Sequence, residues 1–173
     1  APLESRDERG RTALMAATHA DRVDAAQLLI SRGADVNARD AIQDTPYLFA
    51  GGRGRLEILR LALAAGADLT STNRFGSTPL MAASYRGHPD NVRELLRAGV
   101  DVNHVNRLGW TALLETILLG DGGAVHVEIV GLLIAGGADV NIPDAQGVTP
   151  LAHARQRGQD GVAALLRRAG ARP

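Results

Sequence analysis

The chain has 173 residues, of which 45% are hydrophobic and 22% are charged, a composition typical of a folded chain. Nineteen acidic residues balance nineteen basic ones, so no net field attracts nucleic acid or an anionic membrane. Without cysteine or lysine, the sequence has no thiol nucleophile, no thiolate metal ligand and no lysine for Schiff-base chemistry.

Two markers along the chain repeat with one period. Threonines that precede an alanine or proline are spaced by 33, 33, 33 and 38 residues, at Thr12, Thr45, Thr78, Thr111 and Thr149. Glycines that follow a leucine-rich segment are spaced by 33, 33, 38 and 33 residues, at Gly33, Gly66, Gly99, Gly137 and Gly170. Both series indicate five units with a five-residue insertion, residues 121–125, in the fourth. We expect this insertion to be a surface loop between two helices.

The first half of each unit predicts a short helix. The threonine hydroxyl is suited to cap the first turn, and Pro46, Pro79 and Pro150 follow at the first helical position, where a missing N–H costs nothing. In chain order these helices are expected to stop near Asp21, Gly54, Gly87, Gly120 and Gly158.

The second half of each unit predicts another helix that ends at a glycine. Apolar residues recur at helical spacing, as in Val92, Leu95 and Leu96, and we expect Leu95 to lie in the core. Glycine is the residue best suited to the left-handed conformation after a helix. The segments that lead to the next unit are rich in Asn, Asp and Gly, which is typical of turns.

A 33-residue unit of a turn and two helices that starts T-P-L-x-x-A resembles the ankyrin repeat. This resemblance implies an all-α fold: an α-solenoid of five stacked helix-turn-helix repeats with projecting β-turns. Residues 1–173 would form one domain, with repeats near 6–38, 39–71, 72–104, 105–142 and 143–173.

The sequence departs from the family pattern in two ways. The histidine usual after T-P-L is replaced throughout, so apolar packing must substitute for its hydrogen bonds, at Met15, Leu48, Met81, Leu114 and Ala152. The second unit has Gly51-Gly52 inside its first helix and Thr70 where asparagine is usual. Because glycine in a helix costs about 0.5–1 kcal/mol relative to alanine, we expect this unit to be the softest.

No residue pattern indicates catalysis or metal binding. His88 and His126 occupy the same repeat position, which favours a structural role for both. His126 and Glu128 do not share a helix face, and the glycines of 120–123 lack calcium-ligand spacing and a phosphate-binding lysine. We therefore expect a protein that is not an enzyme, with no cofactor and no metal.

The resemblance implies that a partner binds the concave face and the turn tips. Aromatic, apolar and arginine residues gather at these positions in the third and fourth units, and this composition is typical of interface hot spots. The expected contact residues are Arg74, Phe75, Tyr85, Arg107, Leu108, Trp110, Ile117 and Leu118. A competing interpretation is that Ile117 and Leu118 pack under the insertion and that Trp110 covers its own turn.

The function expected from these observations is recognition of another protein or peptide, with no nucleic-acid or membrane partner, by a monomer. The alternative is a structural protein that self-associates through the apolar patch. All nineteen cations are arginine, which favours a GC-rich bacterial genome. The sequence does not assign a compartment: both the bacterial cytoplasm and, if an upstream signal peptide is removed, the periplasm or the exterior stay open.

Overall fold

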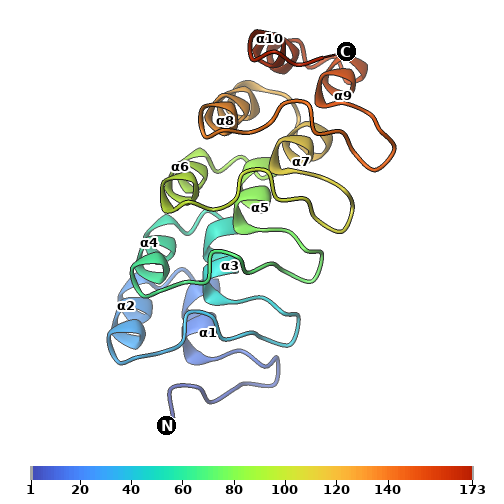
Figure 1. Cartoon of the computed structure of the whole chain (residues 1–173). Helices are drawn as coiled ribbons and strands as arrows, with labels where there is room; N and C mark the ends of the chain where they lie inside the picture. Colours follow the sequence, from blue (N-terminus) through green and yellow to red (C-terminus); the bar gives the residue numbers. More distant parts are fainter. Residues whose placement is uncertain (1, 173) are drawn as a thin grey trace.

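The structure, a computed structural model, describes residues 2–172, which form ten helices in five consecutive pairs (Figure 1). The first helices of the pairs are α1 (Ala13–His19), α3 (Pro46–Gly52), α5 (Pro79–Tyr85), α7 (Ala112–Leu119) and α9 (Pro150–Gln156). The second helices are α2 (Val23–Ser31), α4 (Leu56–Ala64), α6 (Pro89–Ala98), α8 (Ala124–Ala135) and α10 (Asp160–Arg168). These residues contain no strand. The predicted all-α solenoid of five helix pairs is confirmed.

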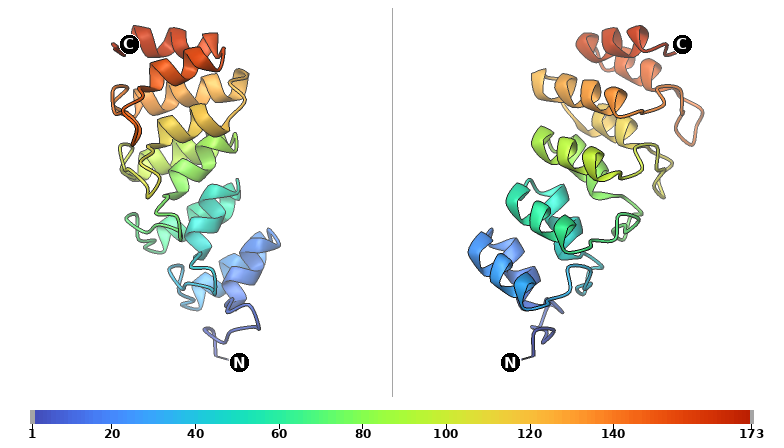
Figure 2. Two further views of the ribbon diagram at one scale, coloured as in Figure 1. Left: turned by 90° about the vertical axis from the view of Figure 1, so that its right-hand side faces the viewer. Right: turned by 60° about the vertical axis from the view of Figure 1, so that its left-hand side comes forward.

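The helix pairs stack side by side along one axis. First helices form one row and second helices form another, and the connecting loops project beyond the row of first helices (Figures 1 and 2). The two termini lie at opposite ends of the stack. Each interior pair therefore contacts the pair before it and the pair after it, as expected of a solenoid.

The five threonines predicted as caps hold the starts of the first helices. Each hydroxyl oxygen accepts a hydrogen bond from the backbone N–H three residues later, with distances from 3.0 Å at Thr45 to 3.4 Å at Thr78. The side chain thus satisfies a donor that the helix itself leaves unpaired. Capping explains why helices as short as seven residues begin at the same place in every unit.

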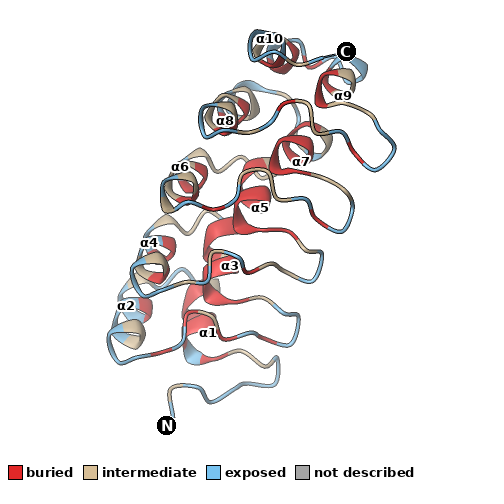
Figure 3. Cartoon of the chain, in the orientation of Figure 1, coloured by how far each residue is buried: buried red, intermediate tan, exposed pale blue. Residues whose placement is uncertain are grey.

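The first helices of the three interior units, α3, α5 and α7, are buried along most of their length (Figure 3). Each of these three helices lies between two other first helices, so side chains on most of its circumference lose solvent contact. The apolar replacements for the usual histidine follow this pattern: Met15, Leu48, Met81 and Leu114 are buried, and Ala152 is half-buried. Apolar packing therefore fills the place of that histidine in four units.

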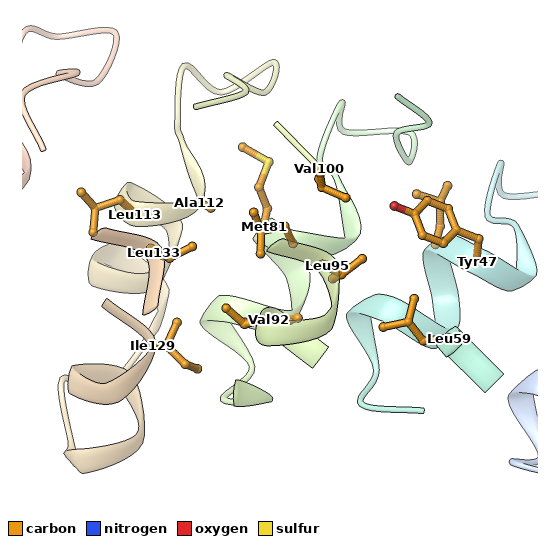
Figure 4. Close-up of a cluster of buried hydrophobic side chains, with 14 of the residues drawn as sticks. Tyr47, Leu59, Met81, Val92, Leu95, Val100, Ala112, Leu113, Ile129 and Leu133 are labelled. Atoms are coloured by element: carbon orange, nitrogen blue, oxygen red, sulfur yellow. The ribbon is translucent and has the colours of Figure 1, made fainter. Parts of the chain in front are cut away.

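The second helices bury only their inner face. Leu59, Leu95 and Leu133 point inward from α4, α6 and α8 and are fully buried (Figure 4). The prediction that Leu95 belongs to the core is confirmed.

Close packing explains the two glycines of α3. A β-carbon at Gly51 would lie 2.5 Å from Cβ of Pro79, and one at Gly52 would lie 2.8 Å from Cβ of Ala82. Only glycine lets α5 approach α3 this closely. The helix propensity that these glycines sacrifice is offset by contact between the second and third units.

Asparagine side chains connect neighbouring units at three of the four junctions. At the first junction, the Asn37 side chain donates to the Gly66 carbonyl (3.2 Å) and accepts from the Asp68 N–H (2.9 Å). Asn103 makes the same pair of bonds at the third junction, and Asn141 makes it at the fourth. At the corresponding position Thr70 is too short, and its hydroxyl instead donates to Asp68 within its own unit.

The prediction that residues 121–125 form a loop is correct only for the first three residues. Ala124 and Val125 are wrongly placed by that prediction, because they form the first turn of α8, which has 12 residues against 9 or 10 in the other second helices. Asp121 accepts hydrogen bonds from the Gly123 N–H (2.8 Å) and from the His126 ring (2.7 Å). The insertion is thus partly absorbed by a longer helix that Asp121 anchors.

Truncation of the core leucine tests the alignment of the units. We expect Leu95→Ala to lower the free energy of unfolding by about 2–5 kcal/mol, since the buried side chain leaves a cavity between units. Leu28→Ala, at an exposed leucine of α2, should change it by less than about 0.5 kcal/mol. Chemical denaturation of both variants measures the difference, and equal effects would contradict the assigned core.

The missing junction link can be restored. Thr70→Asn should add the two bonds seen at the other junctions and raise the free energy of unfolding by about 0.5–1.5 kcal/mol. The reverse change, Asn37→Thr, should lower it by a similar amount. A Thr70→Asn variant whose denaturation midpoint does not rise would show that the asparagine links are not what joins the units.

Candidate functional site

Each projecting turn is closed by one side-chain oxygen. In the third unit, Oδ1 of Asn73 accepts from the backbone N–H groups of Phe75 (2.9 Å) and Ser77 (3.1 Å). The equivalent residue makes the same two bonds in every other unit, at Asp7, Asp40, Asn106 and Asp144. The residues between the acceptor and the end of the turn are therefore held at defined positions on the tip.

The turn tips and first helices of the third and fourth units enclose a hollow of about 240 Å³. We call it the aromatic hollow, and its apolar walls are Phe75, Tyr85, Leu108, Trp110 and Leu119. Phe75, Leu108 and Leu119 are exposed over about half of their surface. Tyr85 and Trp110 are less exposed, with intermediate burial. The structure thus brings together four of the eight predicted contact residues.

Two of the predicted residues on α7 do not line this hollow. Ile117 was expected at the surface but is fully buried, so it belongs to the core, as the competing interpretation held. Leu118 is half-buried, and its carbonyl accepts a hydrogen bond from Arg157. Leu119, which the sequence analysis missed, lines the hollow instead.

Arg107, another predicted contact residue, forms hydrogen bonds to the turn of the third unit. Its guanidinium donates to the carbonyl of Arg74 (3.0 Å), and its backbone N–H donates to the carbonyl of Phe75 (3.2 Å). These bonds tie the fourth turn to the third, so Arg107 holds the turn tips at a fixed separation.

A second hollow, of about 130 Å³, adjoins the first on the side of the second unit. We call it the arginine hollow, because Arg53, Arg74 and Arg86 line it together with Asp44. The two hollows share several lining residues, namely Asn73, Phe75, Ser77, Ala82 and Arg86. They therefore form one continuous groove across the second, third and fourth units.

The floor of the aromatic hollow contains a buried carboxyl group. Oε1 of Glu115 accepts from Ser77 Oγ (2.9 Å) and from Asn106 Nδ2 (2.7 Å), whereas Oε2 has no partner among the described residues. Burial raises the pKa of Glu115, and the hydrogen bonds from Ser77 and Asn106, together with the nearby positive charge of Arg86, oppose this shift. Asn106 both closes the fourth turn and holds this carboxyl, so the turn and the floor are coupled.

His126 forms a hydrogen bond between two units, whereas His104 forms one within the third unit. The two ring nitrogens of His126 contact the Tyr85 carbonyl (2.9 Å) and Asp121, and His104 contacts the Gly76 carbonyl (2.8 Å).

Between residues 2 and 172, no group of three His, Asp or Glu residues is placed to hold a metal ion. No helix in the same range is long and apolar enough to cross a bilayer.

Comparison with known proteins finds ankyrin repeats along the chain. A model of three ankyrin repeats matches residues 47–144, and a single ankyrin repeat matches residues 9–41. The Escherichia coli protein YahD, which is named for ankyrin repeats, is 49% identical over 59 residues. That match covers 34% of this chain and 29% of YahD, so it spans less than a third of the relative.

Two solved bacterial structures resemble the whole stack. An ankyrin repeat domain from Acinetobacter baumannii is 56% identical, with a TM-score of 0.96 over 99% of this chain and 88% of that one. An ankyrin repeat protein from Enterococcus is 39% identical, with a TM-score of 0.93 over 96% of this chain and 85% of that one. Both likenesses cover the described helices almost from end to end.

The buried carboxyl predicts a pH dependence of stability. Because burial raises the folded pKa of Glu115 above its ordinary value of 4.5, the folded state holds the proton more tightly than the unfolded state. Glu115 therefore contributes most to stability below about pH 4.5, and this contribution is lost as the pH rises through the folded pKa.

We compare the free energy of unfolding of the Glu115→Gln variant with that of the unmodified chain. We expect the difference, variant minus unmodified chain, to rise between pH 4 and pH 7. Denaturation midpoints at several pH values measure this difference. Glu8→Gln, at an exposed glutamate, is the control and should show a flat difference. A flat difference for Glu115→Gln as well would mean that the Glu115 carboxyl is solvated in the folded protein.

Proposed function

Because this chain belongs to the ankyrin repeat family, whose domains generally bind proteins, we propose that it holds a segment of a partner protein in the groove described above. The partner contacts the aromatic hollow and the adjacent turn tips. Arg74, Phe75, Tyr85, Leu108, Trp110 and Leu119 supply the contact surface. We further propose that the five units act as one domain and that the chain itself carries out no catalysis.

The grouping of exposed apolar side chains is the observation that carries this proposal. Seven large hydrophobic residues of the described chain are exposed, and four of them line the two hollows: Ile42, Phe75, Leu108 and Leu119. Single exposed apolar side chains need no explanation, but a cluster at a concavity is typical of a binding site. Tyrosine, tryptophan and arginine, the residue types most common at interface hot spots, lie beside them.

The groove is also preorganised for binding. The Asn73 and Asn106 oxygens fix the two turns, and Arg107 ties one turn to the next. A surface that is ordered before binding loses less conformational entropy when a partner arrives. This supports recognition of a partner by an existing shape rather than by folding on contact.

Self-association through the same apolar cluster is the alternative function. In that case the mass in solution would rise with protein concentration, and Leu119→Ala would suppress the rise. We propose a monomer instead, because the aromatic hollow is concave and needs a projecting segment to fill it. Sedimentation of the unmodified chain over a wide concentration range distinguishes the two.

Truncation of the tryptophan tests the proposed function. Peptides selected on the unmodified chain from a random display library serve as the probe. We expect Trp110→Ala to weaken their binding by about 2 kcal/mol or more, as for other central aromatic contacts. Because Trp110 is half-buried, its loss should also lower stability, but by less than the loss of Leu95.

Leu119→Ala is the matched second variant. Because Leu119 is more exposed than Trp110, its truncation removes few core contacts. It should weaken binding while leaving the denaturation midpoint nearly unchanged. Leu28→Ala, on α2, should affect neither. Calorimetry measures the peptide affinity of each variant. If neither Trp110→Ala nor Leu119→Ala lowers this affinity, the proposed site is wrong.

A further inference from the structure

Three arginines converge on the arginine hollow without a carboxylate partner. Within residues 2–172, Arg53, Arg74 and Arg86 make no ion pair at 4.0 Å or less, unlike Arg55, Arg60 and Arg93, which pair on the second-helix side and between units. The hollow carries three positive charges and one carboxyl group, although the whole chain is formally neutral. It is therefore a local excess of positive charge at a concave site.

Each of the three guanidinium groups lies over an aromatic ring. Arg74 lies 4.7 Å from the ring centre of Phe75, Arg86 lies 4.6 Å from that of Tyr85, and Arg53 lies 5.6 Å from that of Phe49. Stacking of this kind fixes the guanidinium plane and leaves its edge available for hydrogen bonds. Of the three side chains, only that of Arg86 donates a hydrogen bond to another described residue, to the Gly52 carbonyl at 3.3 Å.

The single acidic residue of this hollow does not neutralise it. Burial and the neighbouring carboxyl of Asp40 raise the pKa of Asp44, while all three arginines act in the opposite direction. None of the three arginines approaches Asp44 closely enough to form an ion pair. An additional carboxylate is thus the group that the hollow lacks.

We propose that the arginine hollow binds an aspartate or glutamate side chain of the partner, next to an apolar side chain that enters the aromatic hollow. Arginine forks match the planar carboxylate with two parallel hydrogen bonds. Because Phe75 and Arg86 line both hollows, side chains two positions apart on one extended segment, which point to the same side, reach both. This inference rests on the proposed function and names the chemistry of the partner: an acidic and apolar peptide segment.

A carboxylate fits the site better than the phosphates of a nucleic acid. Phosphate backbones are bound by extended basic surfaces, whereas this chain has no net charge and the arginine hollow is small. The adjoining aromatic hollow also favours an apolar side chain.

The test begins with selection of peptides from a random twelve-residue display library on the unmodified chain. We expect enrichment of aspartate or glutamate two positions away from a bulky apolar residue. Arg74→Gln should weaken binding of a selected peptide by about tenfold or more. Arg32→Gln, at an exposed arginine remote from both hollows, should leave the affinity unchanged.

A double-mutant cycle tests the contact itself. Changing the acidic residue of the selected peptide to its amide should weaken binding to the unmodified chain but have little further effect on Arg74→Gln. Circular dichroism and a denaturation curve verify that Arg74→Gln is folded. Arg86→Gln gives the second arm of the cycle.

Peptides without acidic enrichment, or a cycle in which the two changes are additive, would overturn this inference. If those peptides still required Trp110 and Leu119, the proposed function would stand without it. Competition by a single-stranded DNA oligonucleotide that depends on Arg74 would replace the carboxylate by phosphate as the ligand. A library that yields no specific peptide would count against both proposals.

Discussion

The turn tips of the proposed binding surface are each held in place by one side-chain oxygen. That oxygen accepts two backbone N–H groups, two and four residues further along, and this geometry recurs in all five units. Short side-chain acceptors such as Asn and Asp are favoured in turns for this reason. In the fourth unit Asn106 also holds the Glu115 carboxyl, so the turn that carries Leu108 and Trp110 is joined to the floor of the aromatic hollow.

The stack separates the residues that make the fold from those that are free to bind. The first helices are buried between their neighbours, and the second helices bury one face, so the scaffold needs few side chains from the turn tips. The sequence at the tips can therefore vary without loss of the fold. In this chain the second, third and fourth units use that freedom for aromatic, apolar and arginine side chains around one groove.

The repeated features were predictable from sequence, and the features made by contact between units were not. The period, the threonine caps and the burial of Leu95 follow from residue type and spacing alone. Ile117 was misplaced because a short helix between two neighbours has almost no exposed face, which the pattern of one unit does not reveal. Two features depend on how successive units are stacked. Arg53 and Arg86 come from different units to line one hollow, and Pro79 closely approaches Gly51.

The structure of the chain bound to a library-selected peptide tests the central claim most directly. The account predicts a peptide that lies across the turns and first helices of the second, third and fourth units, with an apolar side chain between Phe75 and Trp110. A peptide bound along the second helices, on the opposite side of the stack, would contradict it.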